Sequence, residues 1–150
     1  MTGFDVASKT VTFIDGGKTR FTSSNAAQIS KSIIAVLTHP AETANRLVFV
    51  ESFTTTQLEI LTVLEEITGG KWNVVAKTSE DLRAEGYKAM VEGDLMGAGV
   101  RLITAAVLGK EALEDHTNVE GGIWNEKLGL EGEDLEVELK RILAIAAAKQ

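Results

Sequence analysis

Residues 39–75 read HPAETANRLVFVESFTTTQLEILTVLEEITGGKWNVV, and this stretch decides the expected fold. Its segment Leu47–Val50 is an unbroken apolar run between Arg46 and Glu51. Such a run is typical of a strand that is covered on both faces inside a parallel sheet. A strand of this kind needs parallel neighbours, and the rest of the chain offers few. We therefore expect an α/β fold in which this strand belongs to a larger sheet.

The same stretch continues into a well-marked helix and a second strand. Thr56 and Glu59 have the spacing of a capping box, and the glycine pair 69–70 ends the apolar pattern that follows. The apolar residues on one face of this helix are Leu61, Leu64 and Ile67. The residues from Trp72 to Val75 then predict a short strand.

Upstream, residues 10–21 predict a hairpin and residues 25–38 predict a helix. Polar and apolar residues alternate from Thr10 to Ile14, and the turn sequence DGGK precedes Phe21. Asn25 lies three residues before Gln28, as a helix cap requires. The apolar face of the expected helix carries Ile29, Ile33, Val36 and Leu37, and Pro40 ends it.

Downstream, three more helices are expected. Thr78 and Asp81 open a helix that ends before Gly93. Residues 95–108 are apolar almost all round, so we expect that helix to be largely buried. Residues 111–122 lose all periodicity and predict a loop, and residues from Leu135 onward form a terminal amphipathic helix.

Composition excludes several classes of function. The 150 residues carry a net charge of -7, which argues against binding to nucleic acid or to acidic membranes. There are no cysteines, so disulfides and thiolate chemistry are excluded. No secretory signal and no membrane-spanning stretch is visible. We expect one domain or part-domain over residues 1–150, located in the cytoplasm.

The residues contain no recognisable catalytic, cofactor or metal site. Gly97 and Gly99 begin like a dinucleotide fingerprint, but Leu102 stands at the third glycine position and no strand precedes them. Tyr87 has Val91 four residues later, so the tyrosine and lysine pair of dehydrogenases is missing. We therefore predict no catalytic, cofactor-binding or metal-binding residue in this chain.

Three segments together resemble the C-terminal half of NmrA-like proteins, which belong with the isoflavone-reductase-like group of atypical short-chain dehydrogenases. They are KTVTFIDGGKTRF, SNAAQISKSIIAVLTHPAETANRLVFVESFTTTQLEILTVLEEITGGKW and LGLEGEDL. The resemblance covers nearly the whole chain in order.

The resemblance implies a Rossmann-type protein whose N-terminal half binds NADP or NAD and whose C-terminal half helps to form the substrate cleft. This chain is expected to begin after the first half, so neither the glycine fingerprint nor the reductases' lysine can be transferred to it. Leu47–Val50 would lie in the main sheet. Val11–Ile14 and Trp72–Val75 would build a smaller sheet near the substrate.

Ligands of open α/β sheets collect outside the carboxyl ends of strands. This rule makes Ser52, Phe53 and Thr54 substrate-cleft candidates, with a plain strand-to-helix turn as the alternative. Phe53 either covers a substrate or packs against the helix. Tyr87 is a further cleft candidate, and a half-buried packing role is its alternative.

Two functions from different classes stay open at this point. The first is the substrate-side portion of an NAD(P)-dependent NmrA-like oxidoreductase, which binds no cofactor by itself and takes a small-molecule substrate once an N-terminal half completes it. The second is a non-enzymatic regulatory or partner-binding module, in which the chain self-associates or binds another protein. Whether the chain is an enzyme is left open.

Overall fold

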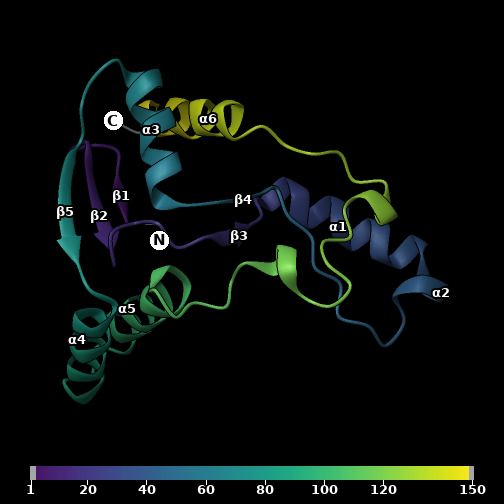
Figure 1. The fold of residues 1–150 in the computed structure, drawn as a ribbon, viewed down its shortest axis with the longest axis horizontal. Coiled ribbons are helices and arrows are strands. Elements are labelled where there is room, and N and C mark those ends of the chain that lie inside the picture. The colour runs from purple at the N-terminus through teal and green to yellow at the C-terminus, as the bar shows by residue number, and fades with distance from the viewer. Residues whose placement is uncertain (1–2, 149–150) are drawn as a thin grey trace.

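The computed structural model describes residues 3–148, which form an α/β arrangement of six helices and two small sheets in that part of the chain (Figure 1). The strands are β1 (Phe4–Asp5), β2 (Thr10–Ile14), β3 (Phe21–Ser23), β4 (Phe53–Thr55) and β5 (Asn73–Lys77). The helices are α1 (Ala26–Thr38), α2 (Pro40–Thr43), α3 (Gln57–Thr68), α4 (Ser79–Val91), α5 (Leu95–Leu108) and α6 (Leu135–Ala147), with short 3-10 turns at His116–Asn118 and Glu126–Leu128.

The first sheet has the order β1-β2-β5. β2 pairs with β5 in parallel, with Val11 opposite Val74, and with β1 in antiparallel orientation. The small sheet expected from Val11–Ile14 and the strand after Trp72 is therefore confirmed. α3 connects β4 to β5 and packs against this sheet together with α6 (Figure 1).

The hairpin expected between residues 10–14 and Phe21 is wrong. Asp15, Gly16 and Gly17 all have positive φ angles (47°, 86° and 70°), and Gly17 N donates to Ile14 O. This turn leads the chain away from β2 instead of back along it. Phe21–Ser23 pairs with Phe53–Thr55 in a separate antiparallel ribbon, β3-β4.

Within residues 3–148, the segment Leu47–Val50 does not form the buried parallel strand that its sequence predicts. The segment is extended, but its pairing within residues 3–148 is a single bridge between Phe49 and Ile123. Leu47 is 80% exposed, whereas Val48 and Val50 pack on one side against a small cluster around Trp124. An apolar run reads the same whether it is covered by strands or by one layer of side chains, so the sequence pattern could not separate the two.

The helix caps follow the sequence closely. The side chains of Asn25, Thr56 and Thr78 each accept a hydrogen bond from the backbone N–H three residues later. Thr56 and Glu59 complete a reciprocal capping box. Local caps depend on one turn of chain, which explains why they were predictable.

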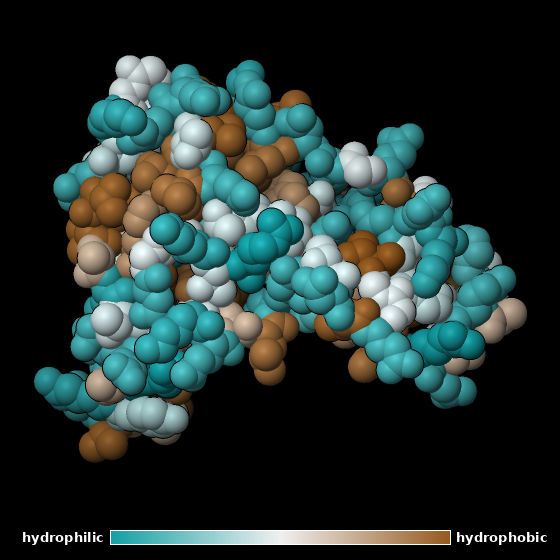
Figure 2. Space-filling model, viewed as in Figure 1, coloured by the Kyte–Doolittle hydropathy of each residue, from teal (hydrophilic) through white to brown (hydrophobic). Residues whose placement is uncertain are grey.

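The burial of two helices differs from the expectation. α1 buries Gln28, Ser32 and Ala35, and its apolar stripe is exposed, with Leu37 at 74%. α5 buries only small residues and its last leucine, and the expectation that it is largely buried is wrong, because Met96 is 82% exposed. Apolar surface also gathers over the three-stranded sheet in Figure 2. The described residues thus leave several apolar helix faces uncovered.

Asp15 joins the turn after β2 to two helices. Its carboxylate accepts hydrogen bonds from Ser79 N at the start of α4 (3.0 Å) and from Lys110 N just after α5 (2.9 Å). Burial pushes the pKa of Asp15 upward, but the hydrogen bonds from Lys110 and Ser79 outweigh it, so the pKa lies below its ordinary value. The ionised carboxylate therefore holds the α4-α5 pair to the sheet.

Candidate functional site

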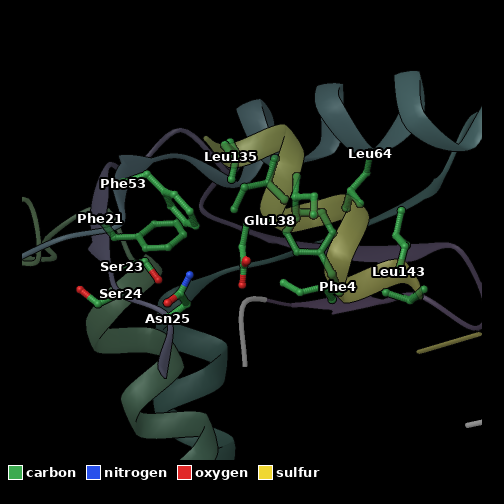
Figure 3. A pocket seen from close by; sticks show the side chains of 14 residues that line it. Phe4, Phe21, Ser23, Ser24, Asn25, Phe53, Leu64, Leu135, Glu138 and Leu143 are labelled. Carbon is green, nitrogen blue, oxygen red and sulfur yellow. The ribbon is translucent and has the colours of Figure 1, made fainter. Parts of the chain in front are cut away.

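A pocket of about 310 Å³ lies where the β3-β4 ribbon faces α6 (Figure 3). This volume is at the lower end of the range for small-molecule sites. Most of the lining is apolar and comes from segments far apart in the sequence. The lining residues are Phe4, Val6, Phe21, Ser23, Ser24, Asn25, Phe53, Ile60, Leu64, Leu135, Glu138, Leu139, Ile142 and Leu143.

The ribbon supplies the aromatic wall of the pocket. Phe53 is the cross-strand partner of Ser23, and Phe21 lies two residues from Ser23 on the same strand. Side chains alternate between the two faces of a strand, so Phe21, Ser23 and Phe53 share one face, which is the face that lines the pocket. Thr22 and Thr54 lie on the opposite face, where their hydroxyls are 2.9 Å apart.

α6 supplies the opposite wall. Leu135, Glu138, Leu139 and Ile142 follow the three- and four-residue spacing of one helix face. Glu138 is the only charged residue in the lining, and Figure 3 shows its carboxylate pointing from α6 toward the side of the pocket where Asn25 lies. The pocket therefore combines an apolar body with one carboxylate and a polar edge.

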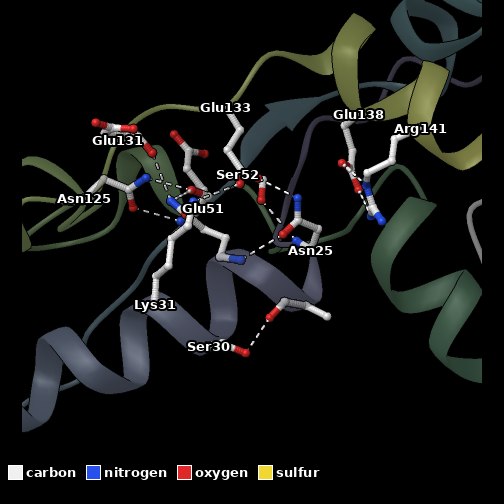
Figure 4. A network of polar contacts seen from close by, with 12 residues as sticks. Asn25, Ser30, Lys31, Glu51, Ser52, Asn125, Glu131, Glu133, Glu138 and Arg141 are labelled. Atoms are coloured by element: carbon white, nitrogen blue, oxygen red, sulfur yellow. Dashed lines mark hydrogen bonds and ion pairs between the residues drawn. The ribbon is translucent and has the colours of Figure 1, made fainter.

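Arg141 keeps the Glu138 carboxylate ionised. Its guanidinium donates to both carboxylate oxygens, from Nε at 2.8 Å and from Nη2 at 2.5 Å (Figure 4). These hydrogen bonds lower the pKa of Glu138, burial opposes them only in part, and Asn25 lowers it further. A ligand group that donates a hydrogen bond is the chemical match for this carboxylate.

A polar network fixes Asn25 at the edge of the pocket. Asn25 caps α1, its Nδ2 donates to Glu133 at 2.6 Å, and its backbone N donates to Ser52 Oγ at 3.0 Å (Figure 4). Gln28, which is fully buried, donates to the carbonyl oxygens of Glu51 and Glu131. These bonds tie α1, the segment before β4 and the segment before α6 together, so the polar edge of the pocket is held rigidly.

The four cleft candidates from the sequence lie in different places. Phe53 lines the pocket. Ser52 is buried behind it and holds Asn25. Thr54 donates to Glu51 on the other face of the ribbon. Tyr87 is 59% exposed on α4, away from the pocket lining, and the half-buried packing role considered for it is wrong.

Sequence reasoning missed Phe21 and Glu138 as pocket residues. Phe21 was placed in a hairpin, and Glu138 was not singled out among the residues of the terminal helix. One signal was present, because Glu138 interrupts the apolar face Leu135, Leu139, Ile142 and is followed by Arg141 at a spacing suited to an ion pair.

Gly97 and Gly99, which resemble the start of a dinucleotide fingerprint, do not form a phosphate-binding turn in the structure. Gly97 and Gly99 lie inside α5 and not in a turn between a strand and a helix. The Asp94 carboxylate accepts a hydrogen bond from Gly97 N at 2.8 Å, so it already occupies the helix start and would repel a phosphate. Thr56 with Glu59 and Thr78 with Asp81 occupy the starts of α3 and α4 similarly.

Residues 3–148 contain neither a cluster of metal-ligating side chains nor a membrane-spanning helix. No group of three or more His, Cys, Asp or Glu side chains is placed to hold a metal ion there. No helix in this part of the chain has the length and apolar character needed to cross a membrane.

The fold and the pocket together define an α/β protein with part of a Rossmann-like architecture. The chain is 36% identical over 104 residues to oxidoreductase poxI from Penicillium oxalicum, a match that covers 69% of this chain and 32% of poxI. It is 25% identical over 95 residues to oxidoreductase aprR from Aspergillus flavus, which covers 63% of this chain and 32% of aprR. No protein-family profile matches it. The chain is thus related to proteins named oxidoreductases and spans about a third of the length of these curated relatives.

Proposed function

We propose that this chain is the substrate-side portion of an NmrA-like, NAD(P)-dependent oxidoreductase-type protein and is not catalytic by itself. Its role is to bind a small, largely apolar substrate. The nicotinamide cofactor of a complete protein would be held by residues outside residues 3–148.

The pocket between the β3-β4 ribbon and α6 is the observation that carries this proposal. Phe21 and Phe53 offer ring faces to a planar or alicyclic ligand, and the leucines of α6 cover its other side. Glu138 accepts a hydrogen bond from a hydroxyl or amine on the ligand. The similarity to proteins named oxidoreductases supports the same reading.

The test is equilibrium dialysis of the chain with 1-methylnaphthalene, a neutral apolar ligand that is small enough to enter the pocket. We expect saturable binding that weakens severalfold in Phe53→Ala. Val91→Ala is the matched control, because Val91 is an apolar residue that is 89% exposed and outside the pocket. Binding that is absent, or equally affected by both substitutions, contradicts the proposal.

A regulatory or partner-binding module is the second candidate, and the exposed face of α1 favours it. Ile29, Ile33 and Leu37 form a continuous stripe at helical spacing, and all three are exposed. Covering this stripe with another protein surface would remove apolar area from water. A chain that binds no apolar ligand but associates through α1 would support this second function over the first.

A further inference from the structure

A second pocket, of about 220 Å³, adjoins the first on the side of α5. The two pockets share Phe21, Ser23 and Ser24, which are residues of β3 and its continuation. The walls found only in the second pocket come mainly from α5. They are Thr22, Ile103, Thr104, Val107, Leu108 and Glu114.

Ser23 lies at the junction of the two pockets. It is half-buried, and its hydroxyl makes no hydrogen bond with any residue between 3 and 148, whereas the Ser24 hydroxyl donates to Val50 O at 3.0 Å. A hydroxyl that is partly removed from water and lacks a protein partner is able to bond to a ligand without breaking an internal contact. Ser23 therefore offers both a donor and an acceptor midway between two apolar spaces.

The α5 side of the second pocket is apolar and already accessible. Ile103 is half-exposed and Val107 is partly buried, and they lie one turn apart on the same helix face. Thr104 bonds to Val100 O within the helix, so its hydroxyl is engaged there. This wall suits the second apolar part of a ligand whose first part lies against Phe53.

We infer that the two pockets form one elongated binding site in which Ser23 bonds to a polar atom near the middle of the ligand and Ile103 with Val107 set the permitted length. The inference rests on the proposed substrate-binding function and deepens it. The ligand class is an apolar molecule longer than one fused-ring system, with a hydrogen-bonding atom between its two apolar parts. Ser23 and Ile103 are then specificity-determining residues.

Three neutral probes separate length from hydrogen bonding in equilibrium dialysis. 1-Methylnaphthalene is small enough to lie within the first pocket alone, 1-benzylnaphthalene adds a phenyl ring, and N-phenyl-1-naphthylamine has the phenyl ring and an N–H in the linker. Ile103→Trp fills the second pocket from an exposed helix position. We expect this substitution to weaken both long probes by about tenfold or more and to leave 1-methylnaphthalene unchanged, because a buried phenyl group contributes affinity of about that size. Val100→Trp, one turn earlier and outside both linings, is the control.

Ser23→Ala tests the proposed hydrogen bond between the Ser23 hydroxyl and the middle of the ligand. It should weaken N-phenyl-1-naphthylamine by about threefold to tenfold and leave 1-benzylnaphthalene unchanged, since only the first probe carries a polar linker. Suppose that all probes bind but Ile103→Trp weakens short and long probes alike, or weakens neither. The single elongated site is then refuted, while the first pocket keeps its proposed function. Equal effects of Ser23→Ala on the two long probes refute the role of Ser23. If no probe binds the unsubstituted chain, the proposed function fails and this inference fails with it.

Discussion

Replacing Gln57 with leucine tests how the sheet is joined to α3. Gln57 is 1% exposed, its Oε1 accepts from Ile14 N at 2.9 Å, and its Nε2 donates to Thr12 O at 2.9 Å. β1 pairs with β2 only as far as Val11, so the Gln57 amide continues the edge of β2 where β1 ends. A leucine at position 57 has a similar side-chain volume and can make neither the hydrogen bond to Ile14 N nor the one to Thr12 O.

The expected loss of unfolding free energy is about 2 to 6 kcal/mol. Each hydrogen bond contributes about 0.5 to 1.5 kcal/mol, and a buried group left without a partner adds about 1 to 3 kcal/mol. The Ile14 N–H is such a group, because Ile14 is 1% exposed. The cavity contribution is small because the two side chains have similar volumes.

Urea unfolding followed by tryptophan fluorescence measures this loss, since Trp72 and Trp124 are both buried, in different apolar clusters. Leu58→Ala, at the exposed neighbouring position, should cost under about 1 kcal/mol and serves as control. Amide exchange at Ile14 should also accelerate in Gln57→Leu. A variant within about 0.5 kcal/mol of the parent, with Ile14 exchange unchanged, would refute the reasoning.

Four further outcomes are expected. In urea melts, Thr56→Ala should lower the free energy of unfolding by about 0.5 to 2 kcal/mol, and Leu64→Ala should lower it by about 2 to 5 kcal/mol. A larger loss in Thr56→Ala than in Leu64→Ala would show that the buried face of α3 is misassigned. The folded-state pKa of Asp15 is lowered, so the stability that its carboxylate contributes is present above the ordinary pKa of 3.8 and is lost as the pH falls through the folded-state pKa. In Asp15→Asn, acid unfolding should therefore lack the loss of stability that protonation of Asp15 causes in the parent chain. Calorimetric titration of the chain with NADPH should show no saturable micromolar binding, since Asp94 occupies the start of α5; saturable binding would require Gly97 and Gly99 to be reconsidered. Light scattering at micromolar concentration should show association that Ile33→Lys reduces, and a monodisperse parent chain would contradict this.

The sequence by itself determined the local structure. The caps at Asn25, Thr56 and Thr78 and the ends of α3 and α4 depend on side chains within one helical turn, so propensity and spacing sufficed to find them. The small sheet formed by Val11–Ile14 and the strand after Trp72 was expected only through resemblance to a family, and its parallel pairing came from the structure. Pattern alone does not choose a partner some 60 residues away in the chain.

The tertiary structure decided which faces are covered. The stripe Ile29, Ile33, Leu37 and the run Leu47–Val50 both have the composition of buried elements, yet α1 turns Gln28 and Ala35 inward and Leu47 lies in solvent. Burial depends on what surrounds an element, and within residues 3–148 the stripe on α1 and Leu47 stay exposed.

The pocket likewise exists only in three dimensions. Phe53 was within reach of sequence reasoning because it follows the apolar run Leu47–Val50, which was expected to be a strand of a parallel sheet, although this run forms only one bridge within residues 3–148. Its neighbours Phe21 and Glu138 come from a strand and a helix more than 100 residues apart, and the turn at Asp15–Gly17 brings the strand to its place. A pocket built by such long-range packing is decided by the joint arrangement of β3, β4 and α6, which no single stretch of sequence encodes.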